Sequence, residues 1–138
     1  MIIDATNLIL GRLASFAAKQ ALLGKKIDIV NCENAIITGN KKWIIARHKQ
    51  KRQMGYPLKG PFIKRMPERY VSRVIRGMLP YKQAKGRQAF EKIKCYIGIP
   101  EKFKDKKLET IKHADVSKVP NLRYMTVKEV CKEMGAKI

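Results

Sequence analysis

Hydrophobic and polar positions follow two different periods in the first part of the chain. Residues 1–5 and 26–31 have the character of short strands, and in the second Ile27 and Ile29 flank an aspartate, the period-two alternation of a half-buried strand. Between them, apolar residues recur at helical spacing before a terminating Gly24, namely Leu10, Leu13, Ala14, Ala17 and Ala21. A strand, a helix and a strand within about 30 residues predict a βαβ unit with parallel strands.

The strand-like segment 35–39 fits two interpretations. It follows the preceding strand after only about four residues, which is too short for a parallel crossover, so it is either an edge strand or an extended connector. From Asn40, a residue type common at helix N-caps, a helix is predicted to run to about Gln50. Trp43 and Ile44 are expected on the apolar side of this helix.

Two further helices and a strand are predicted in the middle of the chain. An apolar stripe marks the first helix, which Pro80 stops, and consists of Val71, Val74, Ile75 and Met78. A weaker helix follows over 83–92. Residues 93–97 have the composition of a strand, closed by Gly98 and Pro100.

The segment 101–138 is predicted to be a C-terminal extension that ends in a helix. Its first residues are charged and irregular, whereas Thr126 and Glu129 form the capping box of a helix over about 126–134. The buried stripe of that helix is expected to consist of Val127, Val130, Cys131 and Met134. The length of 138 residues suits a single domain that covers residues 1–138.

The charge of the chain is strongly positive and unevenly distributed. Lys and Arg total 31 against 11 Asp and Glu, and the net charge of +20 points to a polyanionic partner. Residues 41–94 alone hold 17 basic and 2 acidic side chains, which is three quarters of the net charge. A region dedicated to contact with a polyanion explains this segregation better than a generic basic surface. No apolar run approaches the length of a membrane span, so no membrane partner is expected.

Residues 51–67 are predicted to form a basic loop. Their glycines and prolines oppose a helix or a central strand, and the segment has five basic and no acidic residues. The scattered apolar side chains do not guarantee a packed core of their own. We therefore expect this loop to be mobile in the free protein and ordered on RNA, with Tyr56 and Phe62 packing on RNA or on the docked loop.

The basic segment also combines cations with groups that can stack. Arginine and aromatic planes stack on unpaired bases while lysines neutralise the RNA backbone. No acidic residue lies three or four positions from Arg73 or Arg76, so these two arginines and Arg69 form a ridge that fits phosphates better than a solvated face. The residues expected to contact RNA are Lys41, Lys42, Arg47, His48, Lys49, Lys51, Arg52, Lys59, Lys64, Arg65, Arg69, Arg73, Arg76, Lys82, Lys85 and Arg87.

Residues suited to catalysis are sparse. His48 lies among basic residues and His113 follows a lysine, so neither has an obvious orienting carboxylate, and both are expected to be solvated or to face RNA. The first strand–helix turn lacks G-x-G-x-x-G, and Lys19 stands where a P-loop that ends at Gly24-Lys25 needs its first glycine. No zinc pattern is formed by the cysteines, which are Cys32, Cys95 and Cys131. We expect no enzymatic activity, no cofactor, no metal and no small-molecule substrate.

Several blocks of the sequence, in a characteristic order over about residues 1–100, resemble one protein family. The blocks are Asp4-Ala5, Leu10-Gly11-Arg12-Leu13-Ala14-Ser15, Val30-Asn31 with Glu33, Ile37-Thr38-Gly39-Asn40-Lys41, Ile75-Arg76-Gly77-Met78-Leu79-Pro80, and Gly86-Arg87 through Ile93-Lys94-Cys95-Tyr96-Ile97-Gly98. The chain resembles the universal large-subunit ribosomal protein thirteen family. The sequence Gly98-Ile99-Pro100 is similar to the archaeal and eukaryotic branch of this family, and the short total length is most similar to archaeal members.

This resemblance implies a fold and a function. The family fold is α/β, a three-layer α/β/α arrangement around a small, mostly parallel four-stranded sheet, to which this chain adds a C-terminal helix. The implied function is that of a structural constituent of the ribosome, cytoplasmic and located in the large subunit. It would bind large-subunit ribosomal RNA, contact neighbouring large-subunit proteins and support assembly. The alternatives are an RNA-binding regulator outside the ribosome and a Rossmann-like nucleotide-binding enzyme that modifies RNA.

Overall fold

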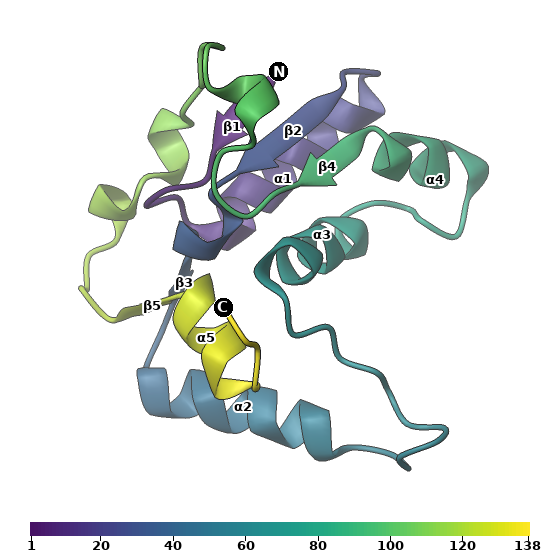
Figure 1. Ribbon diagram of the computed structural model, residues 1–138, viewed down its shortest axis with the longest axis vertical. Coiled ribbons are helices and arrows are strands. Elements are labelled where there is room, and N and C mark those ends of the chain that lie inside the picture. The colour runs from purple at the N-terminus through teal and green to yellow at the C-terminus, as the bar shows by residue number, and fades with distance from the viewer.

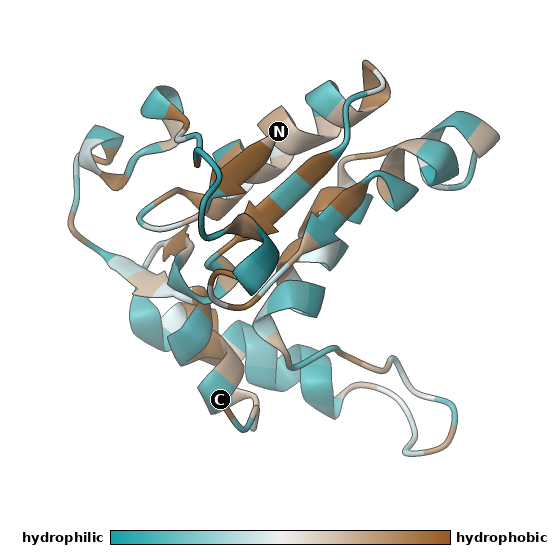
Figure 2. Ribbon diagram, turned by 45° about the horizontal axis from the view of Figure 1, so that its top comes forward, coloured by the Kyte–Doolittle hydropathy of each residue, from teal (hydrophilic) through white to brown (hydrophobic).

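The centre of the computed structural model, which describes residues 1–138, is a parallel three-stranded sheet. Its strands are β1 (Ile2–Asp4), β2 (Ile27–Val30) and β4 (Ile93–Cys95), in the spatial order β1-β2-β4 (Figure 1). Both strand pairs are parallel, which confirms the predicted βαβ unit and the α/β class. The strands are largely hydrophobic in Figure 2, as expected of a sheet covered on both faces.

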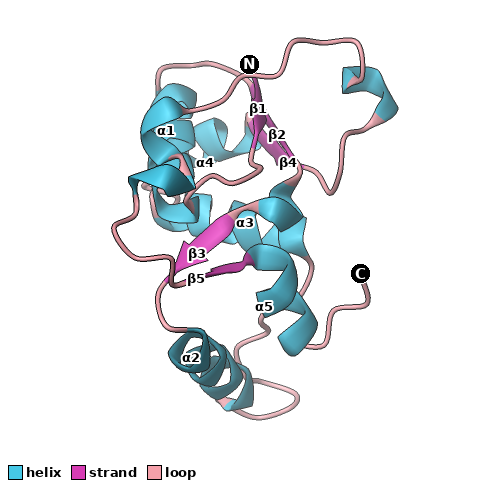
Figure 3. Cartoon of the chain, turned by 90° about the vertical axis from the view of Figure 1, so that its left-hand side faces the viewer, coloured by secondary structure: helices cyan, strands magenta, loops and turns pink.

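Helices and turns cover the two faces of this sheet. Helix α1 (Leu10–Leu22) and helix α4 (Ala84–Glu91) lie on one side, and the chain that follows β4 passes along the other (Figure 3). Before it reaches β5 (Tyr124–Thr126), the chain returns to α1, where Arg12 donates to the His113 carbonyl at 3.0 Å. Alanines and leucines give α1 a narrow buried stripe, which lets this helix pack closely. The expected four-stranded sheet is wrong in its strand count, because the sheet has three strands.

A single residue stands where a fourth strand would lie. Glu109 bridges to Ile3 on the outer edge of β1, where its backbone N–H donates to the Ile2 carbonyl at 2.8 Å and its carbonyl accepts from the Asp4 N–H at 3.0 Å. The residues before it are mostly lysines without apolar alternation. Without that alternation they present no continuous apolar face to the sheet, so the pairing does not extend into a strand.

Segment 35–39 belongs to a second, separate sheet. Its strand β3 (Ile36–Thr38) pairs antiparallel with β5, almost 90 residues later in the chain. The extended segment is therefore an edge strand whose ladder partner comes from the C-terminal extension, and Ile36 also forms a single parallel bridge with Ile9. Helix α5 (Val127–Glu133) follows β5 directly, and both hydrogen bonds of the predicted capping box between Thr126 and Glu129 are present.

Helix α2 (Lys41–Gln53) differs from its prediction in length and in its buried side. Asn40 caps it as expected, because the Asn40 side chain accepts from the backbone N–H of Lys42 at 3.0 Å. The helix ends at Gln53, so the first three residues of the predicted loop 51–67 are helical. Ile44 is buried, but Trp43 is 61% exposed, which corrects its expected place on the apolar side.

Helix α3 (Pro67–Gly77) begins at a proline, so the non-helical part of the loop is 54–66. Proline suits the first helical turn because its missing N–H has no partner there in any helix. The buried side of α3 continues through Val71 and Ile75 to Leu79, and Met78, which was expected on it, is 42% exposed. The spacing of four residues turns this face away from Met78 and towards α1, β4 and α5, which α3 contacts.

Candidate nucleic-acid interface

The basic residues of segment 41–94 lie on the surface with few acidic partners. Of the 16 residues expected to contact RNA, only His48 and Arg76 are half-buried, and the other 14 are exposed. Three ion pairs occur in the whole molecule, and only two of them involve this segment, Lys49 with Glu133 and Arg69 with Glu68. Most of the positive charge is therefore available to an external anion.

Two neighbouring hollows mark this surface on either side of α3. The first, of about 340 Å³, lies between α3, α4 and β4, and the second, of about 360 Å³, lies between α2, the loop and α3. Lys64 and Arg73 line both hollows and form the ridge between them. A third hollow of about 230 Å³ within the loop shares Met54 and Pro61 with the second. The three together form one hollowed basic surface.

The arginines of α3 are each oriented by a local contact. The Arg73 Nη1 donates to the Phe62 carbonyl at 3.4 Å, and the Arg76 guanidinium lies 5.0 Å from the centroid of the Tyr81 ring. Arg69 contacts the carboxylate of the preceding glutamate at 3.8 Å. A guanidinium has five N–H donors, so each arginine keeps donors free for phosphate oxygens.

His48 is placed inside this surface instead of on it. Its Nδ1 lies 2.7 Å from the Ile44 carbonyl and its Nε2 lies 2.7 Å from the Tyr70 hydroxyl. A carbonyl only accepts, so Nδ1 donates to the Ile44 carbonyl, while Nε2 is hydrogen-bonded to the Tyr70 hydroxyl. Both ring nitrogens are thus used to join α2 to α3, which leaves His48 no free nitrogen for a phosphate.

Burial of Tyr70 and a nearby thiol give a pH-dependent prediction. Burial first, and Cys131 second, raise the pKa of Tyr70 from 10.0 to about 12. Because the pKa is higher in the folded than in the unfolded state, the contribution of the Tyr70 hydroxyl to the free energy of unfolding is fully present below about pH 10. This contribution is lost as the pH rises to about 12. Tyr70→Phe removes this titration, so the difference in free energy of unfolding between wild type and variant should shrink from about pH 9 to about pH 11.5 in urea titrations. A difference that stays constant would contradict the burial of this hydroxyl.

Two further members of the predicted set, Lys49 and Arg52, make contacts between α2 and α5. Lys49 Nζ lies 3.3 Å from the Glu133 carboxylate, and Arg52 Nη1 donates to the carbonyl of Met134 at the C-terminal end of α5. A cation at this end of a helix is favourable because the last carbonyls carry partial negative charge. Arg52 also approaches Gly135 so closely that a Cβ there would stand 3.2 Å from its Nη1. Nothing in the local sequence of α2 indicates these long-range contacts.

The remaining members of the set are spread over both ends of the surface. Lys41 and Lys42 occupy the first turn of α2, at the opposite end from the loop. Arg87 donates to the carbonyls of Tyr81 and Lys82 at 3.3 and 3.4 Å and so holds the turn between α3 and α4. The other exposed members are Lys51, Lys59, Lys64, Arg65 and Lys85.

The non-helical loop 54–66 exposes apolar side chains and has few internal hydrogen bonds. Tyr56 is 78% and Phe62 is 67% exposed. Within the loop only the amides of Lys59 and Gly60 donate to backbone, both to the Tyr56 carbonyl at 3.2 and 2.6 Å. The loop therefore gains few hydrogen bonds from ordering on the protein itself. It lies beside the arginines of α3, where Arg73 donates to the Phe62 carbonyl.

Hydrogen exchange tests how far this loop depends on RNA. In the free protein we expect fast exchange at the amides of 54–66 except those of Lys59 and Gly60, because the others have no backbone acceptor. Binding to RNA should slow exchange across the segment as phosphates and bases supply partners. The amides of α3 are the internal reference. Strong protection of the whole loop in the free protein would show that it is preformed.

Cationic groups outside the predicted set also lie on the surface. Lys102 Nζ donates to the Tyr96 hydroxyl at 2.8 Å and stands 4.4 Å from the centre of that ring. Lys26, Lys92 and Lys94 gather at a polar hollow of about 490 Å³ beside the sheet. The predicted set does not contain these four lysines, although Lys92 and Lys94 lie within the basic segment.

Two kinds of site are absent from the molecule. No group of three or more His, Cys, Asp or Glu side chains is arranged to hold a metal ion. None of the helices combines the length and the hydropathy that crossing a membrane requires. All three cysteines are free, and Cys32 and Cys131 are fully buried.

Comparison with known proteins identifies the family. The model of the family described as "Ribosomal protein L13" matches residues 1–102. Similar relatives are proteins named "Large ribosomal subunit protein uL13" from three archaea. The one from Methanopyrus kandleri is 45% identical over 97% of this chain and 86% of the relative, and the one from Methanosarcina barkeri is 43% identical over 99% and 98%. The one from Archaeoglobus fulgidus is 42% identical over 97% of this chain and 86% of the relative. The chain therefore belongs to the ribosomal protein L13 family, whose members are ribosomal proteins and not enzymes.

Proposed function

We propose that this chain is a structural constituent of the large ribosomal subunit that binds its ribosomal RNA through the hollowed basic surface. The observation that carries the proposal is the exposed, largely unpaired charge of segment 41–94, where 14 of the 16 expected contact residues are exposed. The positive charges on such a surface repel one another in the free protein, and binding to RNA phosphates would reduce that repulsion.

The basic surface would serve assembly as well as binding. Its cations come from two helices and the loop 54–66 that joins them, so one RNA segment that contacts both α2 and α3 would be held by all three. Arginines and exposed aromatic rings on the same surface suit unpaired RNA bases. Neighbouring large-subunit proteins are the second class of partner. An exposed apolar cluster of Leu22, Leu23 and Met78, away from the loop, supports a protein contact.

Sedimentation of cell lysate tests the proposal. A tagged copy of the chain should co-sediment with large ribosomal subunits in a sucrose gradient and stay there after a moderate salt wash. Its presence mainly at the top of the gradient would overturn the ribosomal role and favour an RNA-binding regulator. The double variant Arg73→Glu/Arg76→Glu provides the comparison, because it should shift towards the top while remaining folded.

A further inference from the structure

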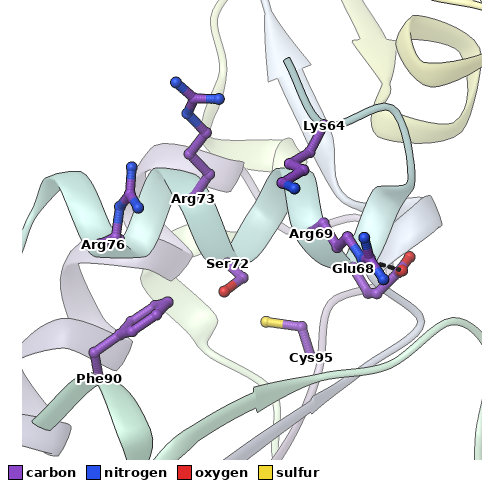
Figure 4. Close-up of a pocket in the computed structure, with 8 residues that line it drawn as sticks. All are labelled: Lys64, Glu68, Arg69, Ser72, Arg73, Arg76, Phe90 and Cys95. Atoms are coloured by element: carbon purple, nitrogen blue, oxygen red, sulfur yellow. Dashed lines mark ion pairs between the residues drawn. The ribbon is translucent and has the colours of Figure 1, made fainter. Parts of the chain in front are cut away.

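The hollow between α3, α4 and β4 combines an aromatic floor with a cationic surround. Figure 4 shows the Ser72 hydroxyl and the Cys95 thiol pointing towards each other below α3, with the Phe90 ring beside them. The volume of about 340 Å³ falls within the range of roughly 300–1,000 Å³ of pockets that hold small organic ligands. A surface that binds only phosphate needs no aromatic ring.

The cations around the hollow outnumber its single acid. Lys64, Arg69, Arg73 and Arg76 line it, while Glu68 is the only carboxylate and contacts Arg69 at 3.8 Å. The arginines are distributed along one helix, so their guanidinium groups span more than one phosphate position along an RNA strand. The Phe90 ring is half-buried and packs on the hydrophobic core, which fixes its orientation.

We propose that this pocket receives one unstacked nucleotide of the bound RNA, an inference that rests on the RNA-binding function proposed above. The base lies against Phe90 and within reach of the Ser72 hydroxyl, and the flanking phosphates lie on Arg73 and Arg76. A base in a double helix is stacked on both faces, so only a base that has left the stack can enter such a concave site. Stacking on an aromatic ring tolerates any base, and the Ser72 hydroxyl can donate to or accept from a base edge.

Alkylation of Cys95 reports directly on occupancy of this pocket. Cys95 lines the pocket, whereas Cys32 and Cys131 are fully buried and serve as internal controls. A side-chain hydrogen bond with Cys95 and burial raise the pKa of the Cys32 thiol, and burial raises the pKa of Cys131 to about 12, so both controls stay as unreactive thiols. The rate of Cys95 modification by iodoacetamide is measured by mass spectrometry on the intact free protein.

Nucleoside monophosphates are the probes. We expect UMP and AMP to slow the alkylation of Cys95 clearly more than inorganic phosphate at the same concentration, because only the nucleotides carry a base. Phe90→Leu, which keeps an apolar side chain but removes the aromatic face, should abolish this difference. Equal protection by phosphate and nucleotide, or no protection by either, would overturn the pocket assignment.

Binding to a large-subunit rRNA fragment separates this proposal from the general one. Phe90→Leu and Ser72→Leu, which fills the pocket, should each lower the affinity by about 10-fold. Ser15→Leu, the same substitution at an exposed position of α1, should leave it unchanged. If both pocket variants bind within about two-fold of wild type while Arg73→Glu/Arg76→Glu binds weakly, the pocket proposal fails and the RNA-binding function stands. If the arginine variant also binds normally, the proposed function itself fails.

Discussion

The double variant Arg73→Glu/Arg76→Glu should lose about 100-fold in affinity for a large-subunit rRNA fragment and keep its fold. Each charge-assisted hydrogen bond to a phosphate is worth on the order of 1.4 kcal/mol, or about 10-fold, and the reversed charges add repulsion. Arg73 is exposed and Arg76 is half-buried on the face of α3 away from Val71 and Ile75, so neither substitution disturbs the core. Surface substitutions of this kind usually change stability by less than about 0.5 kcal/mol.

Salt titration gives this prediction a second readout. The logarithm of the affinity should fall linearly with the logarithm of salt concentration, by about 0.7–0.9 for each phosphate contact. Loss of two contacts should therefore lower the slope by about 2. The control is Lys128→Glu/Lys132→Glu, which makes the same change in net charge at exposed positions of α5. If the affinity of this control and the slope of its salt dependence fall by as much, the net charge of the protein causes the effect and the arginine ridge on α3 does not.

The variant Ile75→Ala should have the opposite profile, with a large loss of stability and intact RNA contacts. Ile75 is fully buried within the main hydrophobic core at the junction of α3 with α1 and β4. Truncation of such a side chain removes burial and leaves a cavity, which costs about 2–5 kcal/mol. Urea unfolding monitored by circular dichroism measures the change in midpoint.

Met78→Ala is the matched control for the core prediction. Met78 lies just after the same helix and is 42% exposed, so its truncation should cost less than about 1 kcal/mol. Under conditions in which Ile75→Ala remains folded, its affinity for RNA should stay near that of wild type. Comparable destabilisation by the two variants would show that the buried side of α3 has been assigned wrongly.

Part of the candidate site follows from local sequence. The ridge on α3 follows from helical spacing and the absence of acids, and the structure presents these arginines beside two hollows. The expected burial of Trp43 is wrong because α2 packs on the core through little more than Ile44. With only one fully buried residue, the helix has no apolar periodicity that would show whether Trp43 or Ile44 faces the core. The Trp43 ring instead lies 5.3 Å from the Arg47 guanidinium on the exposed side of α2.

His48 and Arg52 show that a list of basic residues does not reveal which of them have partners within the protein. Both look free in the sequence because their neighbours are basic. In the structure, the His48 Nε2 is hydrogen-bonded to the hydroxyl of Tyr70, which lies 22 residues later in the chain. Arg52 donates to the carbonyl of Met134, which lies 82 residues later. Partners so far apart in the chain produce no periodic pattern in the sequence, so only the tertiary structure identifies them.

The sequence by itself determined the βαβ unit, the parallel pairing of β1 with β2, the capping box of α5, the family and the concentration of positive charge. These features depend on local period, on residues three or four positions apart, or on composition. The tertiary structure alone decided that β3 pairs with β5 in a separate sheet and that Ile75 and not Met78 is buried. It alone also placed Phe90, Ser72 and Cys95 from three elements around one hollow. Such features depend on which surfaces meet after the chain has folded, and long-range packing selects among faces that local period leaves equivalent.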